Sequence, residues 1–276
     1  MWRGRGRGPV IALVGVDGVG KSSQARTLAA ALRAAGRPAR SFENGGGRPL
    51  LDPLARRFGR RDGPDLLGRR AHLAVEATLR ATAISIALAV CRLRGEIAVM
   101  DRYTYCQYAT MRLRATLPAS EVGRALGPST VGTADGGTTP SRNALGPDGD
   151  GERVHAASSK GTGDAGHSTG DVENAPARAT MAAGERWVRA FYRHFPTPDL
   201  VVWLTLPAEV AQRRVQLRGR DHEDLDRLVA FAAAYADLPE AGSFHQLAAT
   251  GTVEEVHAEL LRLAHATLAH APLDRA

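Results

Sequence analysis

The stretch PVIALVGVDGVGKSSQARTLAAALRAAG, residues 9–36, contains an apolar strand, a glycine-rich loop and a helix in direct succession. Residues 9–16 form a continuous apolar run, which is typical of strands that are buried on both faces of a parallel sheet. Residues 23–36 follow helical spacing and end in a glycine. Because the loop leads into a helix, we expect an anion to bind at the helix N-terminus.

The loop fits the pattern G-x-x-x-x-G-K-[ST] of a phosphate-binding loop, and the strand before it and the helix after it supply the required context. Main-chain N–H groups of residues 18–22 should wrap the β-phosphate of ATP, while Lys21 reaches the β- and γ-phosphates and Ser22 binds Mg²⁺. A glycine-rich turn without a ligand is the alternative. The predicted ATP-binding residues are Gly15, Gly18, Val19, Gly20, Lys21, Ser22 and Ser23.

Strands and helices alternate along the rest of the chain. Apolar runs predict strands at residues 39–43, 96–103, 199–206 and, more weakly, 243–250. Helical spacing predicts helices at residues 50–59, 67–95, 103–114, 181–195, 207–219, 222–238 and 252–271. The last of these opens with Thr252 and Glu255, the pattern of a capping box. The alternation predicts an α/β fold, a parallel sheet with helices on both faces.

Residues 115–180 contain no Ile, Phe, Tyr or Trp and are rich in Gly, Ala, Ser, Thr, Asp and Pro. Such a composition cannot bury enough apolar surface to offset the entropy lost on ordering. We therefore predict a flexible basic tail at residues 1–8, the first part of the folded core at 9–114, a disordered insertion at 115–180 and the second part of the core at 181–276.

The 276 residues carry a net charge of +7, mostly from arginine, which favours a phosphate-bearing partner. Cys91 and Cys106 form no close pair, which predicts a reducing cytoplasm and no cysteine-ligated metal. The longest apolar stretch, residues 81–91, falls short of the about 18 residues that span a bilayer. We expect neither a membrane nor a nucleic acid as partner, since the basic tail is more typical of a solvated terminus.

A second candidate group follows another predicted strand. The sequence IAVMDRY, residues 97–103, has Asp101 and Arg102 at the carboxyl end of the strand, where α/β sheets bind ligands. Asp101 could position Mg²⁺ or its waters, and Arg102 could contact an acceptor phosphate in a bidentate manner. A structural ion pair is the alternative.

The segments GVDGVGKSSQ, MDRY and PDLVVWLTLPAEVAQRRVQLRGRD, in this order, resemble the thymidylate kinase family. The resemblance covers about residues 9–113 and 181–271. It implies a three-layer α/β/α fold of the P-loop type with a five-stranded parallel sheet, and transfer of the ATP γ-phosphate to dTMP with Mg²⁺. It also implies a homodimer paired through the long helix, although the sequence itself leaves the oligomeric state open.

The same resemblance implies roles for single residues. Asp17 would contact the 3′-hydroxyl of the acceptor sugar. Some family members have a catalytic arginine in the phosphate-binding loop, where this chain has Gly18 and Val19. The lid segment 213–221 would therefore supply the arginine that contacts the transferring phosphate. The candidates in this segment are Arg214, Arg218 and Arg220. The implied catalytic residues are Lys21, Asp101, Arg102, Arg218 and Arg220, with Ser22 and Asp101 holding the metal. The implied acceptor-binding residues are Asp17, Glu43, Arg80, Arg102 and Tyr103.

Departures from the family pattern concern the acceptor base. In the segment FENGGGR, residues 42–48, Phe42 replaces an arginine of the family's Arg-Glu-Pro-Gly-Gly. Cys106, Thr110 and Met111 stand where the family has a serine and a Tyr-Gln pair, so the glutamine contact to thymine is missing. Two alternatives therefore stay open: a kinase of another nucleoside or nucleotide, and a non-catalytic nucleotide-binding regulatory protein.

Overall fold

The computed structural model describes residues 8–44, 57–60, 66–116, 175–219 and 224–270. The basic tail up to residue 7, most of the helix expected at 50–59 and most of the insertion expected at 115–180 lie outside the described residues. The division of the chain into core and insertion therefore stays a prediction.

Five strands form one all-parallel sheet in the order β2-β3-β1-β4-β5. The strands are β1 (Val10–Val14), β2 (Ala39–Glu43), β3 (Ile97–Asp101), β4 (Leu200–Thr205) and β5 (His245–Ala248). Every residue of β1 and β3 is buried, as continuous apolar strands require when both faces are covered. From β1 the chain crosses to β2 at one side of the sheet, and from β3 it crosses to β4 at the other side. The strand order therefore reverses between the neighbouring strands β1 and β3, and α/β sheets bind ligands at such a point.

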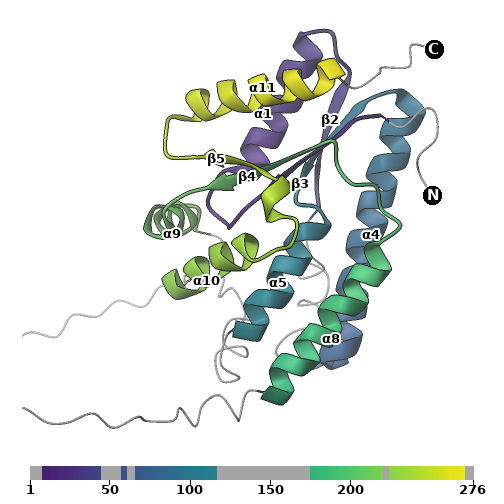
Figure 1. Ribbon diagram of the computed structural model, residues 1–276, viewed down its shortest axis with the longest axis vertical. Coiled ribbons are helices and arrows are strands. Elements are labelled where there is room, and N and C mark those ends of the chain that lie inside the picture. Colours follow the sequence, from purple (N-terminus) through teal and green to yellow (C-terminus); the bar gives the residue numbers. More distant parts are fainter. Residues whose placement is uncertain (1–7, 45–56, 61–65, 117–174, 220–223, 271–276) are drawn as a thin grey trace, which may run out of the picture.

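Helices cover both faces of the sheet, which confirms the predicted three-layer α/β fold (Figure 1). On one face α1 (Lys21–Ala34) packs beside α11 (Val253–His270), and on the other lie α4 (Arg69–Arg94), α5 (Thr104–Thr116) and α8 (Ala175–Tyr192). Helices α9 (Ala208–Leu217) and α10 (Leu225–Ala236) lie between β4 and β5 in the chain. The core contains large, fully buried side chains from the sheet and from both layers, among them Leu13, Leu28, Ile84, Met100 and Leu260.

Local signals in the sequence set several boundaries as predicted. Helix α4 ends at Gly95, whose φ of 63° suits glycine. The capping box before α11 is confirmed: the Thr252 N–H donates to Glu255 Oε2 (2.8 Å) and the Glu255 N–H donates to Thr252 Oγ1 (3.1 Å). Helix α8 differs, because it begins at Ala175 inside the segment expected to be disordered. Pro176 falls in its first turn, where proline is tolerated, so the alanine-rich stretch can continue the helix backwards.

Helix α4 is apolar over a longer stretch than the residues 81–91 expected from the sequence. Among the described residues it provides one stretch, Ala71–Arg94, that is long and apolar enough to cross a membrane, with a mean hydropathy of 1.6. The helix packs against β2, β3 and α8, and Arg80 and Ile84 within it are buried. A core helix passes the same test of length and composition, so the stretch is weak evidence for a membrane span.

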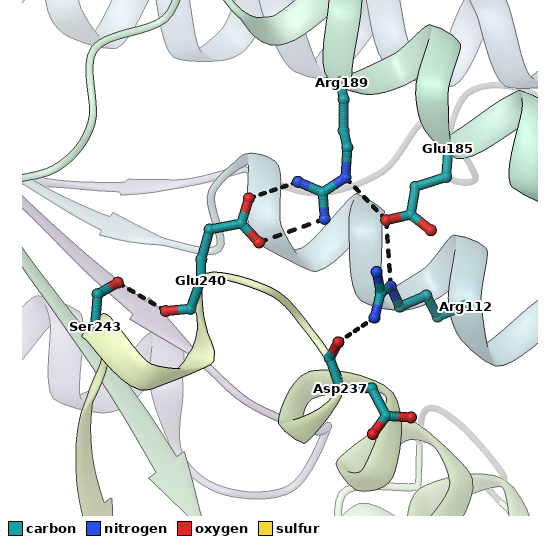
Figure 2. Close-up of polar contacts among 6 residues, drawn as sticks. All are labelled: Arg112, Glu185, Arg189, Asp237, Glu240 and Ser243. Atoms are coloured by element: carbon teal, nitrogen blue, oxygen red, sulfur yellow. Dashed lines mark hydrogen bonds and ion pairs between the residues drawn. The ribbon is translucent and has the colours of Figure 1, made fainter.

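A network of charged side chains joins α5, α8 and the turn after α10 (Figure 2). Arg189 Nε donates to Glu185 Oε1 (2.8 Å), and its Nη1 and Nη2 donate to the two carboxylate oxygens of Glu240 (2.5 and 3.3 Å). Arg112 Nε donates to the same oxygen of Glu185 (3.2 Å), and its Nη1 donates to the Asp237 carbonyl oxygen. Since Arg112 precedes residues 117–174 and Arg189 follows them, the network fastens together the two parts of the chain on either side of that segment.

Replacing Arg189 tests the contribution of the network to stability. In Arg189→Met the carboxylates of Glu185 and Glu240, both less than a third exposed, lose a charged partner. We expect the free energy of unfolding, measured by urea denaturation, to fall by about 1–3 kcal/mol. The control is Arg262→Met, which removes a bidentate pair with Glu259 on the exposed face of α11 and should change stability little. Equal losses in the two variants would contradict the expectation.

Candidate functional site

The glycine-rich loop turns sharply between β1 and α1. Gly15, Gly18 and Gly20 have φ angles of 137°, 90° and 94°, in the region that side-chain-bearing residues rarely adopt. A Cβ atom on Gly15 would lie 2.4 Å from the carbonyl oxygen of Leu204, and one on Gly18 would lie 2.4 Å from that of Ala211. Only glycine fits these two positions. The turn ends at Gly20, the N-cap of α1, so the first N–H groups of that helix point out of its open end.

The loop lines a cavity of about 250 Å³ at the carboxyl end of the sheet. Its walls come from the loop, from the ends of β2 and β3, and from the end of α9. The lining residues are Asp17, Gly18, Gly20, Lys21, Ser22, Glu43, Asn44, Asp101, Arg102, Val215 and Arg218.

Two of the cations that line this cavity contact the same carboxylate. Lys21 Nζ donates to the carbonyl oxygen of Val16 (2.6 Å) and lies 3.4 Å from Asp17 Oδ1, which also accepts from Arg102 Nη2. Burial raises the pKa of Asp17, but Arg102 and Lys21 outweigh it and hold that pKa below its ordinary value. Burial lowers the pKa of Lys21, and Asp17 opposes this effect. The cluster keeps an excess of positive charge and suits an anionic ligand.

A hydroxyl and a carboxylate lie beside this cluster. Ser22 Oγ donates to Asp101 Oδ2, and Asp101 is only 4% exposed. Asp101 Oδ1 is buried and accepts no hydrogen bond from the described part of the chain. Such oxygens are the ligands that Mg²⁺ prefers, and this ion usually takes its remaining ligands from water and phosphate. The pair therefore fits Mg²⁺. No group of three or more His, Cys, Asp or Glu side chains that could hold a metal occurs among the described residues.

The main chain at Arg102 adopts an unusual conformation. Its φ is 71°, and no other non-glycine residue in the described ranges has a positive φ. Such a conformation costs about 1–3 kcal/mol and persists only where the surroundings impose it. The Arg102 N–H donates to the carbonyl oxygen of Leu13 (3.0 Å), at the end of the neighbouring strand β1. The side chain turns towards Asp17 and lines the cavity.

Three of the predicted ATP-binding residues do not line the cavity. Gly15 packs against the main chain of Leu204, Val19 is buried in the core, and Ser23 is exposed. The ATP-binding roles of these three residues stay predictions. Position 15 requires glycine for packing, because the main chain of Leu204 leaves no room for a Cβ atom.

Among the predicted arginines, Arg218 lines the cavity from the end of α9. Arg214 Nη2 instead donates to the carbonyl oxygen of Ala249 (3.4 Å), and Arg220 lies outside the described residues. Arg80 is buried behind the cavity wall, where its Nη1 donates to the carbonyl oxygen of Asn44 (3.0 Å).

The two remaining acceptor candidates differ in position. Glu43 lines the cavity, and its carboxylate also accepts from Arg26 Nη1 (2.5 Å). Tyr103 is buried with its hydroxyl donating to the carbonyl oxygen of Pro196 (2.6 Å), and it does not line the cavity. The structure thus gives Tyr103 a packing role, and its predicted contact with an acceptor stays a prediction.

Two cavity residues escaped the sequence reading, Asn44 and Val215. Asn44 stands where the family segment Arg-Glu-Pro-Gly-Gly has its proline. This difference from the family segment could have identified Asn44 as a candidate. Val215 occupies an apolar position of α9, and nothing in the sequence distinguishes it from core residues.

No family model matches the chain. A thymidylate kinase of Gluconobacter oxydans (strain 621H) is 37% identical to it over 100 residues, which is 36% of this chain and 45% of that protein. The match therefore spans less than half of the relative's length. This partial likeness is to a nucleotide kinase, and it agrees with a sheet and helix arrangement of the P-loop type.

A substitution in the loop tests its shape. In Gly18→Ala the new Cβ would meet the main chain of Ala211, which cannot move aside as a flexible side chain would. We expect Mg²⁺·ATP binding, measured by isothermal titration calorimetry, to weaken at least about tenfold, since displaced N–H groups no longer converge on one anion. The matched control is Gly242→Ala, where the added methyl group meets nothing within 4 Å. Unchanged affinity in a folded Gly18→Ala protein would contradict the prediction.

Proposed function

We propose that the protein is a nucleoside-monophosphate kinase of the thymidylate kinase type, which transfers the γ-phosphoryl group of Mg²⁺·ATP to the 5′-phosphate of dTMP to give ADP and dTDP. The observation that carries the proposal is one cavity in which Lys21 and the N-terminus of α1 face Arg102 and Asp17. A phosphate loop alone indicates nucleotide binding, and a second cation, here from the end of β3, is what an anionic acceptor requires.

The nucleotide side would be formed by the loop. The N–H groups at the start of α1 and the ammonium of Lys21 would hold the polyphosphate, with Lys21 exchanging the Val16 carbonyl oxygen and Asp17 for phosphate oxygens. Ser22 and Asp101 would hold Mg²⁺, which supplies neutralisation of the phosphate charge when bound. The unpartnered Asp101 Oδ1 would then gain a partner in the ion or its waters.

The acceptor side would be formed by Arg102 and Asp17. Arg102 would turn from Asp17 to the acceptor phosphate, and Asp17 would then be free to accept from a sugar hydroxyl. In the transfer, an oxygen of the acceptor phosphate bonds to the γ-phosphorus while the bond from that phosphorus to the β–γ bridging oxygen breaks. Arg218 would neutralise charge on the transferring group, so catalysis rests on positioning and electrostatics.

A kinase with another acceptor is the second candidate, and the helix after β3 favours it. Thr110 Oγ1 donates to the carbonyl oxygen of Cys106 within α5 (2.7 Å), and Met111 is buried. Neither residue replaces the glutamine by which the family contacts thymine. The nature of the acceptor base is therefore the less supported part of the proposal.

Association of two copies and location in the cytoplasm also belong to the proposal. Helix α4 exposes Ile86 and Leu93, and such large apolar side chains suit the pairing through the long helix that the family resemblance implies. Cys91 and Cys106 are both buried and form no disulfide, as expected in a reducing compartment.

An ADP-release assay with a panel of nucleoside monophosphates and nucleosides tests the proposed reaction. We expect turnover that requires Mg²⁺ and acceptor, with the highest kcat/KM for dTMP. Lys21→Met should abolish it, because no other cation of the loop reaches the polyphosphate. Preference for a different acceptor would select the second candidate, and ATP binding without any acceptor-dependent turnover would leave the regulatory alternative.

The role of the lid arginine has its own test. Arg218→Ala should lower kcat by about 10²- to 10³-fold with a much smaller effect on the KM for ATP, since its charge acts mainly on the transferring group. The control is Arg213→Ala on the same helix, because Arg213 is exposed and does not line the cavity. Similar kinetics in the two variants would assign the catalytic cation to another lid residue.

A further inference from the structure

We propose that Asn44 is a positioning residue that fixes the direction in which the Arg102 side chain leaves the main chain, by holding the Arg102 carbonyl oxygen. The inference rests on the proposed function, in which Arg102 binds the acceptor phosphate. Asn44 follows β2 directly, is 2% exposed and lines the cavity. It acts on the reaction through Arg102 and need not touch either substrate.

Asn44 makes three hydrogen bonds to β3, Arg102 and α4 within the described part of the chain. Its N–H donates to the Asp101 carbonyl oxygen (3.0 Å) and its Nδ2 donates to the Arg102 carbonyl oxygen (2.8 Å), so it holds two successive carbonyls after β3. Its own carbonyl oxygen accepts from Arg80 Nη1 (3.0 Å). Asn44 is thus hydrogen-bonded to α4 through Arg80 and to the end of β3 through Asp101 and Arg102.

Arg102 needs such a tie because of its main-chain conformation. At a φ of 71° the residue lies in the left-handed region, which is unfavourable for a side chain with a Cβ atom. The bond from its N–H to Leu13 fixes one of its peptide groups, and the bond from Asn44 Nδ2 fixes the other. Without the second bond the residue can relax to an ordinary φ, and the side chain then leaves in a different direction. The pair with Asp17 depends on the present direction.

The chemistry of asparagine suits this role. A carboxamide of this length offers an N–H donor to a carbonyl one strand away, whereas aspartate offers only acceptors when ionised. An aspartate here would repel the Arg102 carbonyl oxygen and compete with Asp17 for the guanidinium. An alanine keeps the two main-chain bonds of residue 44 and removes only the side-chain bond.

Steady-state kinetics of Asn44→Ala give the first test. We expect kcat/KM for the acceptor to fall about 10- to 100-fold, while the KM for ATP stays near that of the wild type, because only the acceptor cation loses its direction. The matched control is Gln24→Ala. Gln24 is 4% exposed, and its Nε2 donates to the Val253 carbonyl oxygen (3.0 Å). The control variant therefore also loses one hydrogen bond from a buried carboxamide to the main chain. Equal effects of the two variants on acceptor kinetics would overturn the inference.

A double-mutant cycle with Arg102→Lys shows whether the two residues act together. If Asn44 acts through Arg102, Arg102→Lys should cost far less activity in the Asn44→Ala background than in the wild type. Independent, additive losses would mean that Asn44 acts by another route, and would also overturn the inference.

Crystal structures of the wild type and Asn44→Ala give a readout without activity. We expect Arg102 in the variant to leave positive φ and to release Asp17; an unchanged φ with the pair intact would overturn the inference. Asn44→Leu, which is close to asparagine in shape and has neither a donor nor a charge, replaces Asn44→Ala if the latter does not fold. A wild-type protein without acceptor turnover would defeat the proposed function, yet these structures would still decide whether Asn44 directs Arg102.

Discussion

The site depends on one buried ammonium at the carboxyl end of the sheet. Lys21 is 4% exposed, and a buried charge is tolerated only where it is paired and hydrogen-bonded. The Val16 carbonyl oxygen and the Asp17 carboxylate provide that pairing, and Arg102 donates to the same Asp17 oxygen that Lys21 contacts. Gly15, Gly18 and Gly20 have positive φ in this loop, and Lys21 at the start of α1 contacts Val16 and Asp17. The turn of the loop and the pairing of charges therefore involve the same group of residues, Val16, Asp17, Lys21 and Arg102.

The parallel sheet explains why distant parts of the sequence meet there. In the sheet register Leu13 lies beside Asp101, and Asp101 lies beside Glu43, so the loops that follow β1, β2 and β3 leave the sheet at one edge. The contacts of Arg112 and Arg189 with Glu185 join α5, which precedes residues 117–174, to α8, which follows them. The pairing of Arg189 with Glu240 extends the network to the turn before β5 (Figure 2).

Local features were the part of this structure that could be predicted from sequence. The loop between β1 and α1 and the capping box at Thr252 depend on residues close in the chain, and both are found as expected. The burial of Tyr103 and the link from Arg80 to Asn44 depend on which distant main-chain atoms lie nearby, which no pattern along the chain reports. The positive φ of Arg102 was hidden for the same reason, because the main-chain contacts of Arg102 come from Leu13 in β1 and from Asn44 after β2.

The bonds within the cavity bear on which acceptor the proposed kinase would favour. Acceptor binding would replace the Arg102–Asp17 pair and the contact of Lys21 with Asp17, and a partly buried charge left without a partner is costly. A nucleoside monophosphate brings a dianionic phosphate for Arg102, and its sugar hydroxyl can donate to the released Asp17. A nucleoside brings the hydroxyl but no anion, so Arg102 would either stay on Asp17 and block it or turn away unpaired. In the proposed enzyme, discrimination against neutral acceptors would therefore follow from the charge arrangement itself, independently of how the base is recognised.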